Sequence, residues 1–401
     1  MRLKIPAIAA ALALAGCATV DRPQQLAERF LIVDTHIDVP YRLKLNEDDV
    51  SQATESGDFD YPRAVAGGLD APFMSIYIPA SVDAAGGAVE LADELIDMVE
   101  GIAQAAPDKF AVATCTTDVD RIKASGRIAL PLGMENGGPV AGDFANLRHF
   151  RERGIRYITL THSKSNHISD SSYDDFERWQ GLSPFGKTLI GEMNRLGVMI
   201  DVSHISDLAF RQVLDLTEAP VLATHSSLRH FTPGFHRNMS DEMVAAVGAN
   251  GGVIQINFGS SFLTEVAQAY GTDTRKAALA YAFTNQLGED DPRIAEFLKA
   301  YRGEHPYPYA TLDNVLDHID RAVALAGIDS VGIGSDYDGV GDSLPTGLKD
   351  VSTYPNLIAG LLERGYSETD IAKITGGNTM RVWRAAEEIA ARQGNAPLCR
   401  T

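Results

Sequence analysis

Leu31-Ile32-Val33-Asp34-Thr35-His36-Ile37-Asp38 is the stretch from which both the fold and a site can be inferred. Its apolar, β-branched beginning is typical of a buried strand. It ends in an acid, an imidazole and a second acid at alternate positions, which place their side chains on one face, about 6.6 Å apart. Imidazole nitrogen and carboxylate oxygen are common ligands of zinc and similar ions. The stretch therefore indicates a metal site, although a strand end whose polar residues only face water would also explain it.

Short apolar stretches alternate with helical patterns along the rest of the chain. This alternation indicates a parallel sheet, and eight such strands predict an α/β fold of the (β/α)8 TIM-barrel type. The expected strands are Leu31–Asp38, Phe73–Ile78, Ile128–Glu135, Tyr157–His162, Val198–His204, Val221–His225, Gly252–Asn257 and Val331–Asp336. The expected helices are Ala88–Ala105, Phe144–Arg153, Pro184–Leu196, Ser206–Leu216, Ser240–Gly248 and Leu312–Ala326.

Two insertions, Ser163–Gly181 and Glu289–Tyr309, interrupt this alternation. A single domain with decorated loops explains them better than a domain boundary does. We therefore assign residues 30–392 to one barrel domain, residues 18–29 to a short linker and residues 393–401 to a C-terminal tail.

Residues 1–16 have the features of a targeting segment. A basic head precedes the apolar run Ile5–Ala15, which is too short to span a bilayer. Leu14-Ala15-Gly16-Cys17 resembles the bacterial lipobox, so we expect cleavage before Cys17 and lipidation of this cysteine; an ordinary secretory signal with a chance cysteine is the alternative. Because Ala18 follows, the expected location is the periplasmic side of a bacterial membrane, the outer membrane, with a lipid anchor.

The formal net charge is −19, which argues against nucleic acid and against an anionic membrane surface as partners. Cys115 and Cys399 are the cysteines other than Cys17. They could pair in an exported chain, and unpaired burial is the alternative.

Polar residues gather at the ends of the expected strands, where a barrel of this type carries its catalytic groups. They are His36, Asp38, Glu135, His162, His204, His225 and Asp336. His36 and Asp38 can hold one metal, His204 and His225 a second, and Glu135 can bridge them. Two divalent ions about 3.5–4 Å apart can share a hydroxide and polarise a carbonyl. Taken singly, each of these residues could instead be a packed histidine or a turn residue.

Seven motifs in the same order carry a family resemblance across nearly the whole chain: Val33-Asp34-Thr35-His36-Ile37-Asp38, Gly133-Met134-Glu135-Asn136-Gly137, Thr159-Leu160-Thr161-His162, Ile200-Asp201-Val202-Ser203-His204-Ile205-Ser206, Thr224-His225-Ser226-Ser227, Arg237-Asn238-Met239-Ser240-Asp241 and Gly334-Ser335-Asp336-Tyr337-Asp338-Gly339-Val340. As a set they resemble the membrane (renal) dipeptidase family, a zinc-peptidase branch of the amidohydrolase superfamily. The two insertions do not match it, so side-chain specificity is not predicted.

The resemblance implies two zinc ions per chain. It assigns His36 and Asp38 to one ion and His204 and His225 to the other, with Glu135 as the bridge. The implied substrates are dipeptides, including dipeptides with a C-terminal D-residue. The resemblance also allows a homodimer.

The implied mechanism is attack on the scissile carbonyl by a hydroxide that bridges the metals. His162 would stabilise the oxyanion. Asp336 would move the proton from the nucleophile to the leaving amine. Arg237 would bind the substrate carboxylate; a loop ion pair is the alternative for this arginine. Asp34 and Asp338 are interpreted as structural residues or as partners of the ligands.

Two other functions stay open at this point. One is a metal-dependent lactonase, deaminase or amidase of the same superfamily. A dipeptidase would differ from these in needing an anchor for the substrate carboxylate, which Arg237, together with His162, would indicate. The other is a lipid-anchored binding protein without activity, which predicts gaps in the ligand set.

Overall fold

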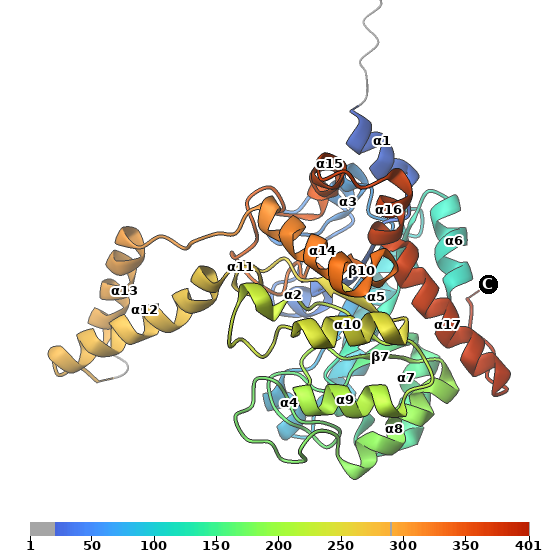
Figure 1. The fold of residues 1–401 in the computed structure, drawn as a ribbon, viewed down its shortest axis with the longest axis horizontal. Helices are drawn as coiled ribbons and strands as arrows, with labels where there is room; N and C mark the ends of the chain where they lie inside the picture. The colour runs from blue at the N-terminus through green and yellow to red at the C-terminus, as the bar shows by residue number, and fades with distance from the viewer. Residues whose placement is uncertain (1–20, 289–290, 401) are drawn as a thin grey trace, which may run out of the picture.

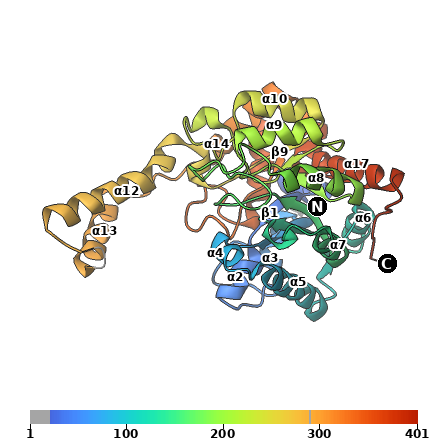
Figure 2. The same ribbon diagram turned by 90° about the horizontal axis from the view of Figure 1, so that it is seen from below.

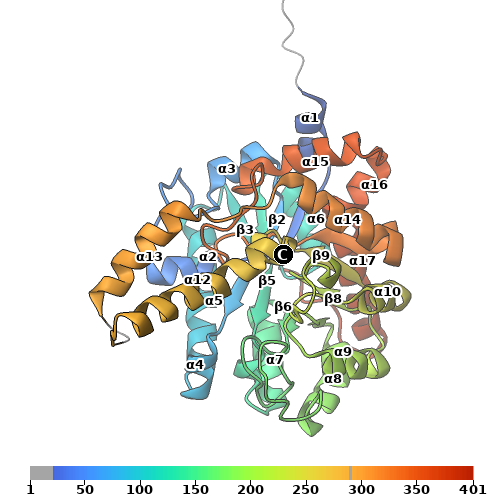
Figure 3. The same cartoon turned by 60° about the vertical axis from the view of Figure 1, so that its left-hand side comes forward.

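Eight parallel strands close into a barrel in the computed structural model, which describes residues 21–288 and 291–400 (Figure 3). Around the barrel the order is β1 (Val33–Ile37), β10 (Val331–Ile333), β9 (Val253–Ile256), β8 (Leu222–Ala223), β7 (Met199–Asp201), β6 (Ile155–Thr159), β5 (Leu132–Glu135) and β2 (Ala71–Tyr77). The predicted (β/α)8 fold is confirmed, and all eight expected stretches contribute a strand to the barrel.

The barrel closes where β1 pairs with β10, with Asp34 opposite Ile333. The buried Asp34 carboxylate accepts the backbone N–H groups of His36 at 3.1 Å and Ser335 at 3.0 Å. It also accepts the hydroxyl of Tyr354. Of the two predicted alternatives, Asp34 therefore has the structural one: it holds the first and last barrel strands together.

The six expected helices lie around the barrel as α5 (Ala88–Ala105), α7 (Phe144–Arg153), α8 (Pro184–Leu196), α9 (Asp207–Leu216), α10 (Asp241–Asn250) and α14 (Leu312–Ala326). Serine side chains cap α8, α9 and α10 by accepting a backbone N–H of the first turn. Left-handed glycines follow α8 and α10, as is common at helix ends.

The N-terminal end of the barrel is covered by α17 (Asn378–Arg392). Trp383 of this helix is fully buried among the first residues of the strands, including Val33, and its ring lies 5.3 Å from that of Phe73. The preceding helices α15 (Tyr354–Glu363) and α16 (Glu368–Ala372) lead into it. With this end filled by apolar side chains, the C-terminal end is the one that can hold a site.

One expected strand divides in two. The stretch 128–135 forms β4 (Ile128–Leu130), which pairs with β3 (Phe110–Val112) in a separate two-stranded sheet, and β5, which joins the barrel. Pro131 lies between them and has no N–H with which to continue a ladder. Several barrel strands are also shorter than expected, so His162, His204, His225 and Asp336 lie in the loops just beyond their strands.

Part of the predicted linker 18–29 belongs to the fold. Arg22–Arg29 form helix α1, whose Leu26 and Ala27 are buried, and α1 packs against α15 (Figure 1). The linker prediction is wrong for this segment because its two apolar residues cover the domain. Residues 1–16 and Cys17 lie outside the described residues, so the predicted leader and lipidation site stay predictions.

The C-terminal tail is also fixed to the domain. Cys399 forms a disulfide with Cys115, which precedes α6 (Thr116–Ala124), so pairing is the alternative that the structure supports. The backbone N–H of Arg400 donates to Asp118 at 2.9 Å.

The insertion predicted at 289–309 is part of a longer helical arm that extends sideways from the barrel (Figures 1 and 2). It consists of α12 (Glu265–Thr284) and α13 (Pro292–Glu304). Only Ala267 and Thr274 of the described residues in these helices are buried, so α12 lacks the apolar stripe that would have predicted it. Short helices α2 (Val39–Leu45), α3 (Tyr61–Gly67), α4 (Ala80–Ala84) and α11 (Ser260–Leu263) complete the loops. In the described part of the chain, no helix combines the length and apolarity needed to cross a membrane.

Candidate metal centre

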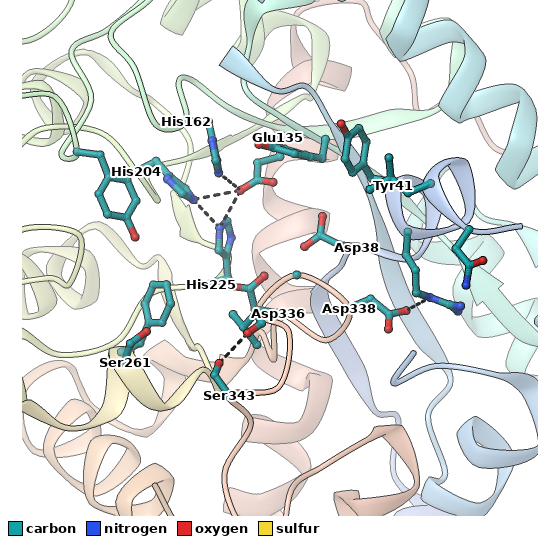
Figure 4. A pocket seen from close by; sticks show the side chains of 18 residues that line it. Asp38, Tyr41, Glu135, His162, His204, His225, Ser261, Asp336, Asp338 and Ser343 are labelled. Atoms are coloured by element: carbon teal, nitrogen blue, oxygen red, sulfur yellow. Dashed lines mark hydrogen bonds and ion pairs between the residues drawn. The ribbon is translucent and has the colours of Figure 1, made fainter. Parts of the chain in front are cut away.

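A cavity of about 770 Å³ opens at the C-terminal end of the barrel (Figure 4). The predicted site residues that line it are Asp38, Glu135, His162, His204, His225 and Asp336. His36 lies fully buried beneath them. Residues that are up to 300 positions apart thus meet at one barrel mouth, as the strand-end pattern predicted.

Glu135, the last residue of β5, lies at the centre of the group. Its Oε1 atom is 3.1 Å from Nε2 of His204 and 3.1 Å from Nε2 of His225. Its Oε2 atom is 3.5 Å from Nε2 of His36. The two carboxylate oxygens therefore face different histidines, which is the arrangement expected of a bridging ligand.

Asp38 follows β1 and stands at the start of α2, with Oδ2 at 3.5 Å from Nε2 of His36. Three overlapping triads of ligand atoms lie within 4.8 Å: His36, Glu135 and His225; Glu135, His162 and His204; and His36, Asp38 and Asp336. The second and third triads include His162 and Asp336, which the sequence analysis did not count as ligands.

The donor atoms fit divalent metal ions. Nε2 of His36 and Oδ1 of Asp38 are buried and have no hydrogen-bond partner among the described residues. The Nε2 atoms of His204 and His225 lie 2.9 Å apart and face the same carboxylate oxygen. Buried polar atoms without partners are costly, whereas imidazole and carboxylate donors in this number suit zinc.

The protonation states of three of these groups are those that metal binding needs. Burial lowers the pKa values of His204 and His225 well below the ordinary histidine range. Burial alone would raise the pKa of Glu135, but the neighbouring His162 and His36 outweigh it and hold that pKa well below its usual range. For His36, burial lowers the pKa, but Tyr157 and the nearby carboxylates outweigh it and raise that pKa well above the usual range. At neutral pH two of the imidazoles are therefore free bases and the carboxylate is ionised.

A hydrogen-bonded chain orients His225 from behind. Its Nδ1 lies 2.8 Å from the hydroxyl of Thr224, and this hydroxyl donates to Oδ2 of Asp201 at 2.6 Å. Such partners fix the tautomer of a ligand. Neither residue was predicted to have this role, although an acid within a buried strand, as Asp201 is, could have indicated it.

Left-handed backbone conformations cluster where the strands end. Asn136, His204, Asp336 and Asp338 have φ values of 76°, 69°, 65° and 64°. Residues other than glycine rarely adopt them, and such strain concentrates at functional sites. Here it turns the chain sharply after β5, β7 and β10, so that the side chains of the site meet at the mouth.

Asp336 and His162 lie at opposite sides of Glu135 (Figure 4). Oδ2 of Asp336 accepts a hydrogen bond from Asn257 at 2.7 Å. Burial raises the pKa of Asp336 to about 7, and the carboxylates of Asp38 and Glu135 add to the effect. His162 has Nε2 at 3.6 Å from Oε1 of Glu135, and burial lowers its pKa. Asp336 can therefore exchange a proton near neutral pH, whereas His162 is neutral there and can donate a hydrogen bond through its N–H.

Arg237 is buried beside the cavity in the loop after β8, although it is not among the residues that line it. Its guanidinium donates to the Ser226 hydroxyl and to the His225 carbonyl, both at 2.8 Å. It lies 5.4 Å from the ring of Phe262. No described carboxylate pairs with it, so the ion-pair alternative is wrong, and N–H groups stay available for a ligand.

Asp338 pairs with Arg42, whose Nε donates to it at 2.9 Å, and so has the predicted structural role. The cavity walls also contain four aromatic residues that were not predicted as part of the site: Tyr41, Tyr77, Tyr173 and Phe262. Tyr173 comes from the insertion 163–181, whereas no described residue of 289–309 lines this cavity. The first insertion therefore contributes to the site.

Comparisons with known proteins agree with this geometry. Residues 20–396 match the family model described as "Membrane dipeptidase (Peptidase family M19)". The chain is 33% identical to "Dipeptidase tcpJ" of Claviceps purpurea over 86% of its own length and 74% of the relative's.

Two solved structures are similar over most of the chain. The probable dipeptidase PvdM from Pseudomonas aeruginosa superposes with a TM-score of 0.79 at 29% identity, covering 92% of this chain and 98% of that one. A metallo peptidase from Rhodobacter sphaeroides, liganded with a phosphinate mimic of the dipeptide L-Ala-D-Ala, gives 0.72 at 25% identity, with 89% and 99% covered.

Proposed function

The chain belongs to the membrane dipeptidase family, peptidase family M19, and we propose that it hydrolyses dipeptides, including those with a C-terminal D-residue, with two zinc ions at the barrel mouth. As a member of this family it is a metallo-dipeptidase, a hydrolase that acts on peptide bonds. The observation that carries the two-ion proposal is that the oxygens of Glu135 face different histidines. The L-Ala-D-Ala mimic bound by the Rhodobacter sphaeroides relative supports the D-residue proposal.

In this proposal His36 and Asp38 would hold one ion, His204 and His225 would hold the other, and Glu135 would serve as a ligand of both. When bound, the ions would lower the pKa of a water molecule and polarise the scissile carbonyl. The missing partners of His36 Nε2 and Asp38 Oδ1 support this assignment.

The chain's own groups supply the remaining chemistry. Asp336 keeps Oδ1 free while Asn257 holds Oδ2, so it can take a proton from the attacking water and pass it to the leaving amine. His162 can donate an N–H to the oxygen that becomes negative during attack. Arg237 can offer its unused N–H groups to the terminal carboxylate of a dipeptide.

A dipeptide panel tests this function. Zinc-loaded protein should cleave L-Ala-L-Ala and L-Ala-D-Ala, and chelator-treated protein should not. L-Ala-D-Ala amide, which lacks the carboxylate, should be cleaved poorly because Arg237 has nothing to bind. Elemental analysis should find about two zinc ions per chain. Protein that holds two ions and cleaves no dipeptide would refute the substrate proposal; protein that binds less than half an ion would refute the metal proposal.

We also propose that the protein is anchored through Cys17 on the periplasmic side of a bacterial membrane, the outer membrane. The disulfide between Cys115 and Cys399 supports an oxidising compartment. In a bacterial host, Cys17→Ser should move the protein from the membrane to the soluble fraction; retention in the membrane would contradict the anchor. A homodimer stays a prediction that analytical ultracentrifugation can test.

A further inference from the structure

The ring of Tyr157 lies inside the barrel beneath the metal centre. It extends from β6, is fully buried, and packs 5.4 Å from the ring of Phe73. Its hydroxyl reaches β1, although β5 and β2 lie between β6 and β1 in the barrel wall. There it contacts the Thr35 carbonyl at 2.9 Å and Nδ1 of His36 at 3.0 Å.

These two contacts determine which nitrogen of His36 carries the proton. A phenol has a single proton, and Tyr157 donates it to the Thr35 carbonyl. The phenol oxygen can therefore only accept a hydrogen bond from Nδ1 of His36, so Nδ1 must carry the hydrogen. In the neutral ring, the form that binds a metal, Nε2 is then the nitrogen with the lone pair, and this is the atom that faces Asp38 and Glu135.

The barrel is built to make room for this ring. Gly133 lies on β5, between β2 and β6. A Cβ atom at this position would lie 1.9 Å from Cζ of Tyr157, so no other residue fits without moving the ring. The strand that carries Glu135 thus also provides the space through which Tyr157 reaches the opposite ligand.

We propose that Tyr157 is a positioning residue for the metal ligand His36, fixing its tautomer and the direction of Nε2. The inference rests on the proposed metal site. It concerns the ion of His36 and Asp38 alone, because Thr224 has the matching role behind His225, and Nδ1 of His204 has no partner among the described residues. Removing such a partner typically lowers metal affinity about 10- to 100-fold.

The test is Tyr157→Phe, which keeps the ring and deletes the hydroxyl. Zinc-loaded protein is dialysed against graded concentrations of chelator, and the zinc retained is counted by elemental analysis. One of the two ions should be lost at a free-zinc concentration about 10- to 100-fold higher than in the wild type. Tyr337→Phe is the matched control, because this buried hydroxyl contacts the Leu348 carbonyl and Thr353 instead of a ligand.

Ligand backgrounds separate positioning from a general loss of structure. In a His204→Ala background, Tyr157→Phe should weaken the ion that remains; in a His36→Ala background, it should change nothing, because the ligand that it positions is gone. Thr224→Val should give the reverse pattern. Nitrogen-15 NMR of histidine-labelled, metal-free wild type adds a readout without mutation. At a pH high enough for the His36 ring to be neutral, His36 should be protonated at Nδ1.

The outcomes distinguish the two proposals. Wild-type protein that binds no zinc pair would refute the metal site itself. Wild-type protein that binds two ions, while Tyr157→Phe holds both as tightly, would overturn the role of Tyr157 and leave the proposed function intact. A neutral His36 that carries its proton on Nε2 instead of Nδ1 in the NMR spectrum would also overturn it, even if Tyr157→Phe failed to fold.

Discussion

Replacing His318 by asparagine should reduce stability at neutral pH and reduce it much less in acid. His318 lies on α14 and is fully buried. Its Nδ1 accepts the N–H of Leu228 at 3.1 Å, and its Nε2 lies 3.0 Å from the carbonyl of Leu263, to which it donates. The ring must therefore be neutral. Through these two hydrogen bonds, His318 connects two segments at the site. One is the loop that leads to Arg237, and the other is the end of α11, next to Phe262 in the cavity wall.

The shift in the pKa of His318 determines how much the free energy of unfolding changes with pH. Burial lowers the pKa of His318 from 6.5 to about 4, outweighing the contact with the Leu263 carbonyl, which acts in the opposite direction. Between these values the unfolded chain binds a proton that the folded chain excludes. The stability that neutral His318 contributes is therefore fully present above pH 6.5 and is lost as the pH falls towards 4. At about 1.4 kcal/mol per unit, it amounts to roughly 3 kcal/mol.

Urea unfolding of the wild type and of His318→Asn, in the same metal state and at several pH values between 7.5 and 4.5, measures the stability that His318 contributes. His318→Asn should cost about 1–3 kcal/mol at pH 7.5, because the Leu263 carbonyl loses its donor. The gap to the wild type should then close as the pH falls. Exposed His305, just after α13, provides the control: the free energy of unfolding of His305→Asn should change with pH as that of the wild type does. A gap for His318→Asn that stays constant down to pH 4.5 would refute the reasoning.

Three further predictions concern the site and the tail. Arg237→Met should raise KM for dipeptides about 100-fold with a smaller change in kcat, because it removes a charge-assisted contact to the substrate carboxylate; unchanged steady-state kinetics would count against the anchor. Asp336→Asn should lower kcat about 10²- to 10⁴-fold and leave the zinc content near the wild-type value; a full loss of zinc would make Asp336 a ligand instead. Cys115→Ser should lower the free energy of unfolding by about 2–4 kcal/mol under non-reducing conditions, with no change in kcat; equal stability of variant and wild type in denaturant titrations would show that the tail contributes nothing.

The barrel was predictable from sequence because each strand is short, apolar and followed by a helix or a polar loop. The convergence of the candidate ligands was predictable for a related reason. In a closed parallel barrel, every strand end faces the same mouth, so His36, Glu135 and His204 had to converge if the fold was right.

Other features depend on contacts that sequence patterns do not carry. Tyr157 has the pattern of an ordinary core residue of its strand, and only the space left by Gly133 allows its hydroxyl to reach His36. The arm helix α12 has few buried residues and therefore no stripe to detect. Arg22–Arg29 looked like a linker because the surface that covers Leu26 is formed by α15, more than 300 residues later.

The pairing of β1 with β10, which closes the barrel, has a consequence for when the enzyme can acquire its metal. Asp34 accepts the amide of Ser335, 301 positions further along the chain, and this contact closes the ring of strands next to His36. A polypeptide still emerging from the ribosome already contains His36 and Asp38 but lacks the β1–β10 pairing that fixes their positions. Metal loading must therefore be a late event in maturation, completed after synthesis and governed by the ions available where the finished chain folds.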